Sequence, residues 1–160
     1  MRKKTASLFQ TTCRLAGRLG QAGKKEAEAL EEYGRNLGLA FQVTDDLLDL
    51  VGQPSRTGKP AFSDLKEGRV TLPLILALRK ADSSGRRKLT TLLEKIKDGK
   101  DEQLWPELLF QLRNAGAFHQ AHRQAASFTA RAREAAGRLQ PSVYRQSLLQ
   151  LADFVLHREQ

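Results

Sequence analysis

The chain has 160 residues, 40% of them hydrophobic, which suffices for one domain with a buried core. Its net charge of +9 at pH 7 favours anionic partners such as phosphates, nucleic acid or acidic lipid headgroups. The single cysteine, Cys13, excludes an internal disulfide. We recognise neither a signal peptide nor an apolar run long enough to span a membrane. We therefore expect a cytoplasmic protein without an integral membrane segment.

Apolar residues recur at helical spacing along most of the chain, and no stretch alternates as a half-buried β-strand does. The pattern predicts a first helix over residues 3–19 and a second over residues 24–51, the latter about 42 Å long. Further helices are expected over residues 72–81, 85–97, 102–114, 117–139 and 142–157, with glycine, serine or proline between them. The fold class is therefore all-α, an antiparallel helical bundle in a single domain over residues 1–160.

A basic connection rich in glycine, proline and serine follows the second helix over residues 52–70. A connection of this length without secondary structure usually forms a lid or a binding loop, or is disordered. Four basic residues in it can return toward the second helix: Arg56, Lys59, Lys66 and Arg69. Thr71 is expected to cap the next helix, in whose first turn Pro73 needs no N–H.

An acidic stripe runs along the second helix. At 100° per residue, five of its residues fall within about 60° of one line, and large apolar residues occupy the remaining circumference. These five are Gly38, Gln42, Asp45, Asp46 and Asp49. Removing carboxylates from water is costly unless a cation meets them, and Mg²⁺ suits them because it binds oxygen ligands and completes its shell with water and phosphate. The alternative is an ordinary solvated acidic face.

Gly34 and Gly38 also lie on this helix, four residues apart. Positions four residues apart share one face of a helix. Because glycine has no side chain, this face can be approached closely by another helix or by a ligand.

The motifs of this region resemble those of the trans-isoprenyl diphosphate synthases, also called polyprenyl synthetases. The matching stretches are FQVTDDLLDL from Phe41, GKP from Gly58, SDLKEGR from Ser63 and TLPLILAL from Thr71. A lone DDxxD would be weak, but these flanking motifs in this order are specific. The resemblance extends from Lys4 to the last helix, and SDLKEGR with TLPL is similar to the medium- and long-chain (octaprenyl-like) members.

The resemblance implies a metal site and a reacting group on the second helix. Asp45, Asp46 and, more peripherally, Asp49 match the family's second aspartate-rich motif, whose carboxylates hold Mg²⁺ against an allylic diphosphate. Gln42 matches a glutamine that faces the reacting allyl group. We therefore expect Mg²⁺ as cofactor and Gln42 among the catalytic residues.

The resemblance also implies a set of diphosphate-binding residues. Lys4 and Thr5 match a lysine-threonine pair that contacts the allylic diphosphate, and Lys59 matches another diphosphate-binding lysine. Arg69 stands where the family usually has lysine, and a guanidinium can still bind phosphate in a bidentate manner. Arg158 resembles a basic residue of the homoallylic diphosphate site.

The family's first aspartate-rich motif lies upstream of the lysine-threonine pair, at which this chain begins. The chain thus resembles the C-terminal half of a synthase, isoprenoid-synthase-like in fold with the N-terminal half missing. In the complete enzyme, the resemblance implies Mg²⁺-dependent condensation of isopentenyl diphosphate with an allylic diphosphate. We expect the chain alone to be inactive, and its exposed apolar face to bind a second copy or the missing half.

Two other functions stay open. A non-catalytic helical subunit or remnant could bind diphosphate or a partner chain without performing chemistry. The charge alone suggests a nucleic-acid binder. We expect no nucleic-acid partner, because no DNA-binding motif is recognised and the aspartates of the second helix oppose a phosphate backbone.

Overall fold

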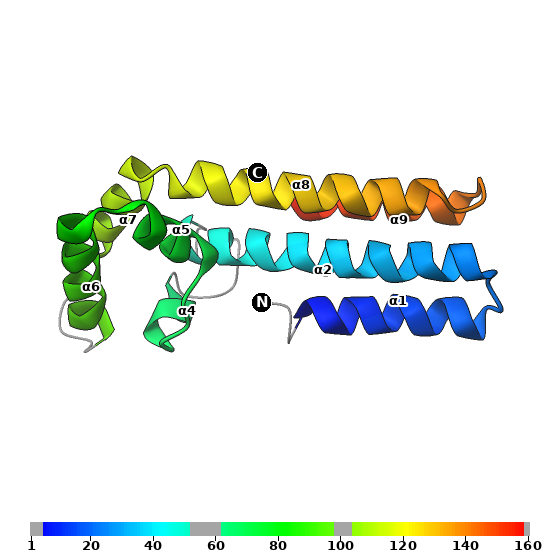
Figure 1. Ribbon diagram of the computed structural model, residues 1–160, viewed down its shortest axis with the longest axis horizontal. Coiled ribbons are helices and arrows are strands. Elements are labelled where there is room, and N and C mark those ends of the chain that lie inside the picture. Colours follow the sequence, from blue (N-terminus) through cyan, green and yellow to red (C-terminus); the bar gives the residue numbers. More distant parts are fainter. Residues whose placement is uncertain (1–4, 52–61, 98–103, 159–160) are drawn as a thin grey trace. The chain divides into compact units, whose positions relative to one another are not determined.

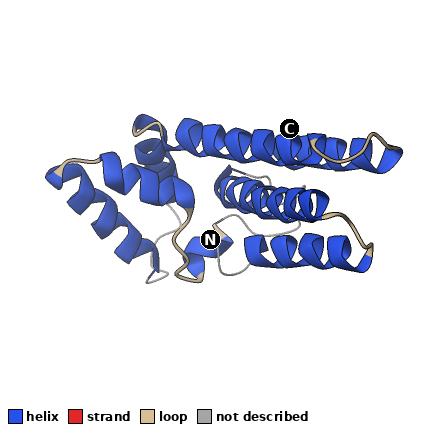
Figure 2. Ribbon diagram, turned by 45° about the vertical axis from the view of Figure 1, so that its right-hand side comes forward, coloured by secondary structure: helices blue, strands red, loops and turns tan. Residues whose placement is uncertain are grey.

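The computed structural model describes residues 5–51, 62–97 and 104–158 (Figure 1). All regular secondary structure in these ranges is helical, as Figure 2 shows, which confirms the predicted all-α class. The chain divides into two compact units, unit 1 (Met1–Thr44 and Arg123–Gln160) and unit 2 (Asp45–His122). No helix in the described ranges is both long enough and apolar enough to cross a membrane.

Unit 1 is built from four helices. They are α1 (Ser7–Leu19), the first part of α2 (Lys24–Val51), most of α8 (Ala117–Gly137) and α9 (Val143–His157). Tyr33 and Leu37 of α2 pack in its core against buried alanines of α8, with Ala152 and Val155 of α9. Small alanine side chains let these helices approach closely, so that the larger side chains of α2 fill the space between them.

Gly34 and Gly38 provide the contact between α1 and α2. A Cβ atom at Gly34 would lie 2.5 Å from the carbonyl oxygen of Phe9, and one at Gly38 would lie 2.7 Å from the Cα atom of Ala6. Both distances are far inside van der Waals contact, so α1 can pack here only against glycine. The predicted close approach is therefore made by a helix.

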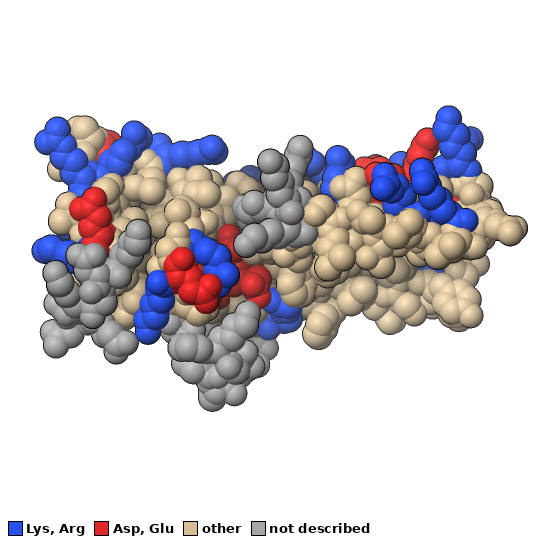
Figure 3. Space-filling view, turned by 90° about the horizontal axis from the view of Figure 1, so that it is seen from below, with Lys and Arg blue, Asp and Glu red and all other residues tan. Residues whose placement is uncertain are grey.

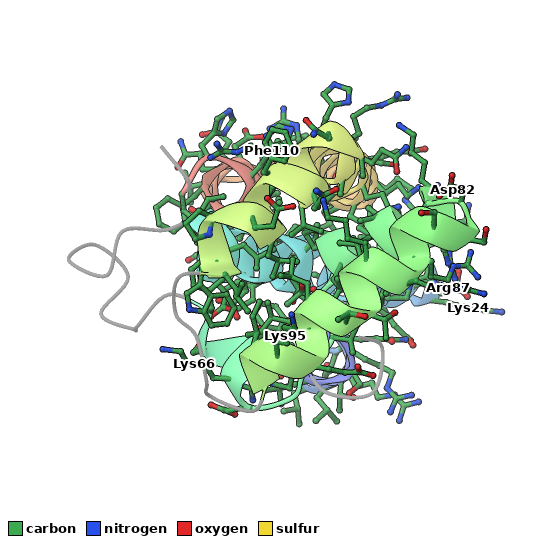
Figure 4. All side chains as sticks on the ribbon, turned by 90° about the vertical axis from the view of Figure 1, so that its left-hand side faces the viewer. Lys24, Lys66, Asp82, Arg87, Lys95 and Phe110 are labelled. Atoms are coloured by element: carbon green, nitrogen blue, oxygen red, sulfur yellow. The ribbon has the colours of Figure 1, made fainter. Side chains whose placement is uncertain are left out.

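Unit 2 contains the end of α2 and a set of shorter helices. These are α4 (Ser63–Lys66), α5 (Leu72–Lys80), α6 (Ser83–Lys97) and α7 (Trp105–Asn114), followed by the start of α8. Its core contains leucines from α5, α6 and α7, together with Leu50 of α2 and Ala117 of α8. Figure 4 views this unit from the α6 side, where Arg87 and Lys95 lie on the outer surface of α6.

The helix bounds agree closely with the sequence prediction, except within the basic connection. α2 begins and ends at the predicted residues, and α5 and α9 differ from prediction by one residue at one end. The short helix α4 lies where a loop was predicted. Four residues are too few to show a helical period, so α4 depends on contacts with the rest of unit 2. The single domain stays a prediction.

Candidate functional site

The aspartate-rich motif occupies the last two turns of α2, within unit 2. Leu47 and Leu50 are buried and anchor this part of the helix in the protein interior. Asp45 and Asp49 are half-buried, and Asp46 is only 5% exposed. A carboxylate with so little exposure needs partners, because burial of an unpaired ion costs several kcal/mol.

Asp46 accepts a hydrogen bond from the N-terminus of α5. Its Oδ2 atom accepts a hydrogen bond from the backbone N–H of Leu72, at 2.8 Å in a buried setting. Thr71 occupies the N-cap position with an extended backbone, but its side chain makes no capping hydrogen bond. The prediction that Thr71 caps this helix is therefore right in position and wrong in mechanism, because Asp46 accepts from the first helical N–H instead.

Asp49 binds the start of α4 with both carboxylate oxygens. Its Oδ1 accepts from the backbone N–H of Ser63 at 3.0 Å and from the Ser63 hydroxyl at 2.6 Å. Its Oδ2 accepts from the backbone N–H of Asp64 at 3.1 Å. The backbone carbonyl of Asp49 accepts from the N–H of Phe62 at 2.8 Å. Four hydrogen bonds thus join one residue of α2 to three consecutive residues at the start of α4.

A ring stack holds α4 from another direction. The rings of Phe62 and Trp105 stack with centroids 4.1 Å apart and an interplanar angle of 10°. The Nζ atom of Lys66 lies 5.9 Å from the centre of the Trp105 ring, within cation–π range. Trp105 is the first residue of α7, so the ring stack joins the start of α7 to the start of α4.

A fourth carboxylate group, Asp64, adds to the charge of the three aspartates of the motif. Its pKa is raised, first by burial and then by the negative charge of Asp49, with a smaller contribution from Asp45, and the positive charge of Arg69 opposes the increase. The Nη2 atom of Arg69 lies 2.9 Å from Oδ1 of Asp64 and 2.8 Å from Oε2 of Glu67. Figure 3 shows acidic and basic side chains in contact on the face that carries α4.

The residue types around the motif fit a hard divalent cation. Aspartate oxygens are the ligands that Mg²⁺ prefers. After burial, the negative charge of Asp49 is the next cause of the raised pKa of Asp64, and a bound cation would offset such a charge. In the described ranges, no three histidine, cysteine, aspartate or glutamate side chains are already arranged to hold a metal ion. Metal binding by Asp45, Asp46 and Asp49 stays a prediction.

Unit 1 brings other predicted residues together. The hydroxyl of Thr5 donates a hydrogen bond to Oε1 of Gln42 at 2.9 Å. The guanidinium carbon of Arg158 lies 4.2 Å from the centre of the Phe41 ring, and the Phe9 ring lies 5.6 Å from the same centre. The Thr5 hydrogen bond fixes the orientation of the Gln42 amide. Lys4 and Lys59 lie outside the described residues.

The comparison with known families decides the affiliation. The family described as Polyprenyl synthetase matches residues 1–110. The chain belongs to the polyprenyl synthetase family. A curated member of related sequence, the short chain isoprenyl diphosphate synthase of Methanothermobacter thermautotrophicus, is 38% identical over 157 residues. That alignment covers 98% of this chain and 47% of the relative.

Solved structures of polyprenyl synthetases share the fold. The geranylgeranyl pyrophosphate synthetase of Pyrococcus horikoshii superposes with a TM-score of 0.85 at 31% identity, over 98% of this chain and 46% of the other. A polyprenyl synthase of Caulobacter crescentus, crystallised with calcium and isoprenyl diphosphate, gives 0.85 at 32% identity, over 99% and 48%. The isoprenoid-synthase-like fold is confirmed, and the chain spans about half the length of these relatives. Its medium- or long-chain character stays a prediction.

Sequence reasoning missed two residues that the structure places beside the polyprenyl synthetase motif. Ser63 donates twice to Asp49, and Asp64 is the additional carboxylate. Both belong to the SDLKEGR stretch, which was used only to recognise the family. An acidic residue in the first turn is a local signal of a helix start, but it does not indicate contact with Asp49.

Proposed function

We propose that this chain supplies the second aspartate-rich half of a polyprenyl diphosphate synthase. The complete enzyme would condense isopentenyl diphosphate with an allylic diphosphate, with Mg²⁺ as cofactor. Without the other half, the chain would have no prenyl-transfer activity. A cytoplasmic location, in keeping with the single cysteine, belongs to the same proposal.

The observation that carries the proposal is the arrangement at the end of α2. Asp46 and Asp49 join the aspartate-rich motif directly to the segment that contains Arg69, through the hydrogen bonds to Leu72, Ser63 and Asp64. A carboxylate cluster next to a guanidinium group suits a metal-bound diphosphate, because carboxylates bind the metal cation and a guanidinium group binds the anionic phosphate oxygens. The calcium and isoprenyl diphosphate bound by the Caulobacter crescentus relative are of the same chemical classes.

The proposed role of each residue follows from the chemistry of its side chain. Asp45, with Asp46 and Asp49, would hold Mg²⁺, which when bound offsets the negative charge on a leaving diphosphate. Arg69 would bind phosphate oxygens through two parallel N–H groups. These contacts would replace its ion pairs with Asp64 and Glu67. By the resemblance, Lys4 and Lys59 would add positive charge to the same diphosphate.

Two described residues of unit 1, Gln42 and Arg158, also have proposed substrate roles. By the resemblance, Gln42 would face the reacting allyl group, and the hydrogen bond from Thr5 helps to orient its amide. By the resemblance, Arg158 would bind the homoallylic diphosphate, and its guanidinium group lies within cation–π range of the Phe41 ring.

A partner is part of the proposal, because the chain spans about half the length of its relatives. Large apolar side chains are exposed on α1 and α9 of unit 1, among them Leu8, Leu19, Tyr144 and Phe154. Several large exposed apolar side chains are typical of surfaces that another chain covers. A polypeptide equivalent to the other half of a synthase, or a second copy of this chain, would cover them.

The test is reconstitution. The purified chain is incubated with Mg²⁺, radiolabelled isopentenyl diphosphate and an allylic diphosphate, alone and with a separately expressed N-terminal half of a polyprenyl synthetase. We expect labelled prenyl product only in the mixture, and none when Asp45→Asn replaces the wild-type chain. Asp82→Asn, which makes the same change at an exposed aspartate outside the motif, is the matched control and should retain full activity.

The outcomes separate the candidate functions. Product formed by the chain alone would refute the need for a second half. Mg²⁺-dependent binding of pyrophosphate by calorimetry, without product in any mixture, would instead favour the non-catalytic subunit. Binding that persists unchanged in Asp45→Asn would refute the metal assignment.

A further inference from the structure

The segment over residues 62–72 is attached to α2 at both of its ends. At one end, Asp49 accepts hydrogen bonds from Ser63 and Asp64. At the other end, Asp46 accepts from Leu72. Arg69 lies between these two attachments, and its backbone N–H donates to the carbonyl oxygen of Asp64 at 2.7 Å.

Neither helix of this segment provides its own side-chain cap. The N-cap residue of α4 is Phe62, with a φ of 63°, and the N-cap residue of α5 is Thr71; neither makes a capping hydrogen bond. The first N–H groups of a helix lack intrahelical partners and must find acceptors elsewhere. Asp46 and Asp49 are those acceptors, and they belong to α2 instead of to the helices they cap.

We infer that Asp46 and Asp49 are positioning residues that hold the Arg69 segment against the end of α2. Through these hydrogen bonds the motif fixes Asp64, and Asp64 pairs with Arg69 through its side chain and its carbonyl oxygen. A diphosphate role for Arg69 rests on the proposed function. The positioning of Arg69 rests on the hydrogen bonds alone.

The geometry makes different demands on the two aspartates. The hydrogen bond from Leu72 uses one oxygen of Asp46, and the carbonyl oxygen of an asparagine can accept that bond. Asp49 uses both oxygens, Oδ1 toward Ser63 and Oδ2 toward Asp64. Asparagine at this position keeps one acceptor and puts an N–H₂ donor where the other was. Asp46→Asn should therefore preserve the attachment, and Asp49→Asn should preserve only half of it.

The experiment measures amide hydrogen exchange by NMR on the full 160-residue chain without ligand. In Asp46→Ala, the Leu72 amide should exchange about tenfold faster or more, and in Asp46→Asn within about threefold of wild type. In Asp49→Asn, either the Asp64 amide or the Ser63 amide should lose protection while the other keeps it. In Asp49→Ala both should lose it, while the Phe62–Trp105 stack keeps α4 in the folded protein.

A second readout distinguishes positioning from general stabilisation. The Nε–H resonance of Arg69, identified by its absence in Arg69→Lys, should shift in Asp46→Ala and in Asp49→Ala and return in Asp46→Asn. The matched control is Asp82→Ala, which removes an exposed cap of α6 in the same unit, where Oδ1 accepts from the Gly85 N–H at 2.7 Å (Figure 4). This control should leave the Arg69 and Leu72 signals unchanged.

Equal loss of Leu72 protection in Asp46→Asn and Asp46→Ala would overturn the inference for Asp46. Unchanged exchange at Leu72, Ser63 and Asp64 in the alanine variants, or an Arg69 resonance that shifts equally in Asp82→Ala, would overturn it altogether. If Asp46→Ala does not fold, Asp46→Asn alone decides, since full retention of Leu72 protection without the charge supports a hydrogen-bonding role. Failure of the proposed function would appear separately, as Mg²⁺-dependent pyrophosphate binding that is absent or insensitive to Asp45→Asn.

Discussion

The hydroxyl group of Tyr33 in α2 donates a hydrogen bond to the backbone carbonyl oxygen of Leu148 in α9, at 2.8 Å. Tyr33 is 1% exposed and belongs to the core of unit 1, so this bond joins two helices that are 115 residues apart in the chain. The ring is buried in the core, and the hydroxyl finds a hydrogen-bond acceptor in the Leu148 carbonyl.

Tyr33→Phe should lower the free energy of unfolding by about 1–2 kcal/mol, because the Leu148 carbonyl loses a donor while the packing of the ring is retained. Urea denaturation followed by circular dichroism measures the change. Tyr144→Phe is the matched control: its side chain is 80% exposed, and we expect a change within about 0.5 kcal/mol. Equal effects of the two variants would contradict the role given to the Tyr33 hydroxyl.

Gly34→Ala and Gly38→Ala should each destabilise unit 1 by about 1–3 kcal/mol, since α1 must move away to admit a methyl group. At Gly34 the new Cβ would also lie 2.7 Å from the Sγ atom of Cys13. Gly137→Ala is the control in α8, where nothing lies within 4 Å of the added atom. There alanine should raise stability slightly, by up to about 1 kcal/mol, as expected from its helix propensity. The idea of a glycine contact would fail if the three variants melted alike.

Most helices could be predicted from the sequence because their apolar residues repeat over three or more turns. In α2, Leu37, Val43, Leu47 and Leu50 are buried along its length, and the periodicity that marked them also placed the acidic stripe. The close approach at Gly34 and Gly38 followed from the missing side chains alone.

The hydrogen bonds of the candidate site could not be predicted in the same way. They join Asp46 to Leu72 and Asp49 to Ser63, residues 26 and 14 positions apart, and no local rule connects them. Local reasoning assigned the cap of α5 to Thr71, the residue with the usual chemistry. The predicted helix start was correct, but the acceptor is Asp46 of α2, which the tertiary structure brings to the N–H of Leu72.

Cys13 should react slowly with thiol reagents in the folded protein. Burial raises the pKa of its thiol above the ordinary value of 9.0, so the thiolate fraction at pH 8 is smaller than in the unfolded chain. The rate of reaction with a chromogenic disulfide, measured from pH 7 to 10, should rise at higher pH in the folded protein than in urea. A folded protein that reacts as fast as the unfolded chain would contradict a packed thiol.

The same shift predicts a loss of stability at alkaline pH. A raised pKa in the folded state means that the contribution of neutral Cys13 is fully present below pH 9.0 and is lost as the pH rises through the folded value. Tyr33 acts in the same direction, because burial first and the Cys13 charge second raise its pKa. Cys13→Ala should therefore unfold with a weaker pH dependence between pH 8 and 10 than wild type, and an identical dependence would contradict the assignment.

The outer face of α1 should mediate association with a partner. Leu8, Leu15 and Leu19 are 65%, 48% and 84% exposed, and their spacing of seven and four residues places them on one side of the helix. Because burial of a leucine side chain contributes about 1.5–3 kcal/mol, Leu15→Gln with Leu19→Gln should weaken association by about tenfold or more.

Phe110→Gln is the control, since Phe110 is similarly exposed but lies on α7 in unit 2 (Figure 4). Light scattering over a range of concentrations, with and without the N-terminal half of a synthase, measures the effect. A wild-type chain that stays monomeric under both conditions would contradict the proposed surface, and equal weakening by Phe110→Gln would show that the loss is not specific to α1.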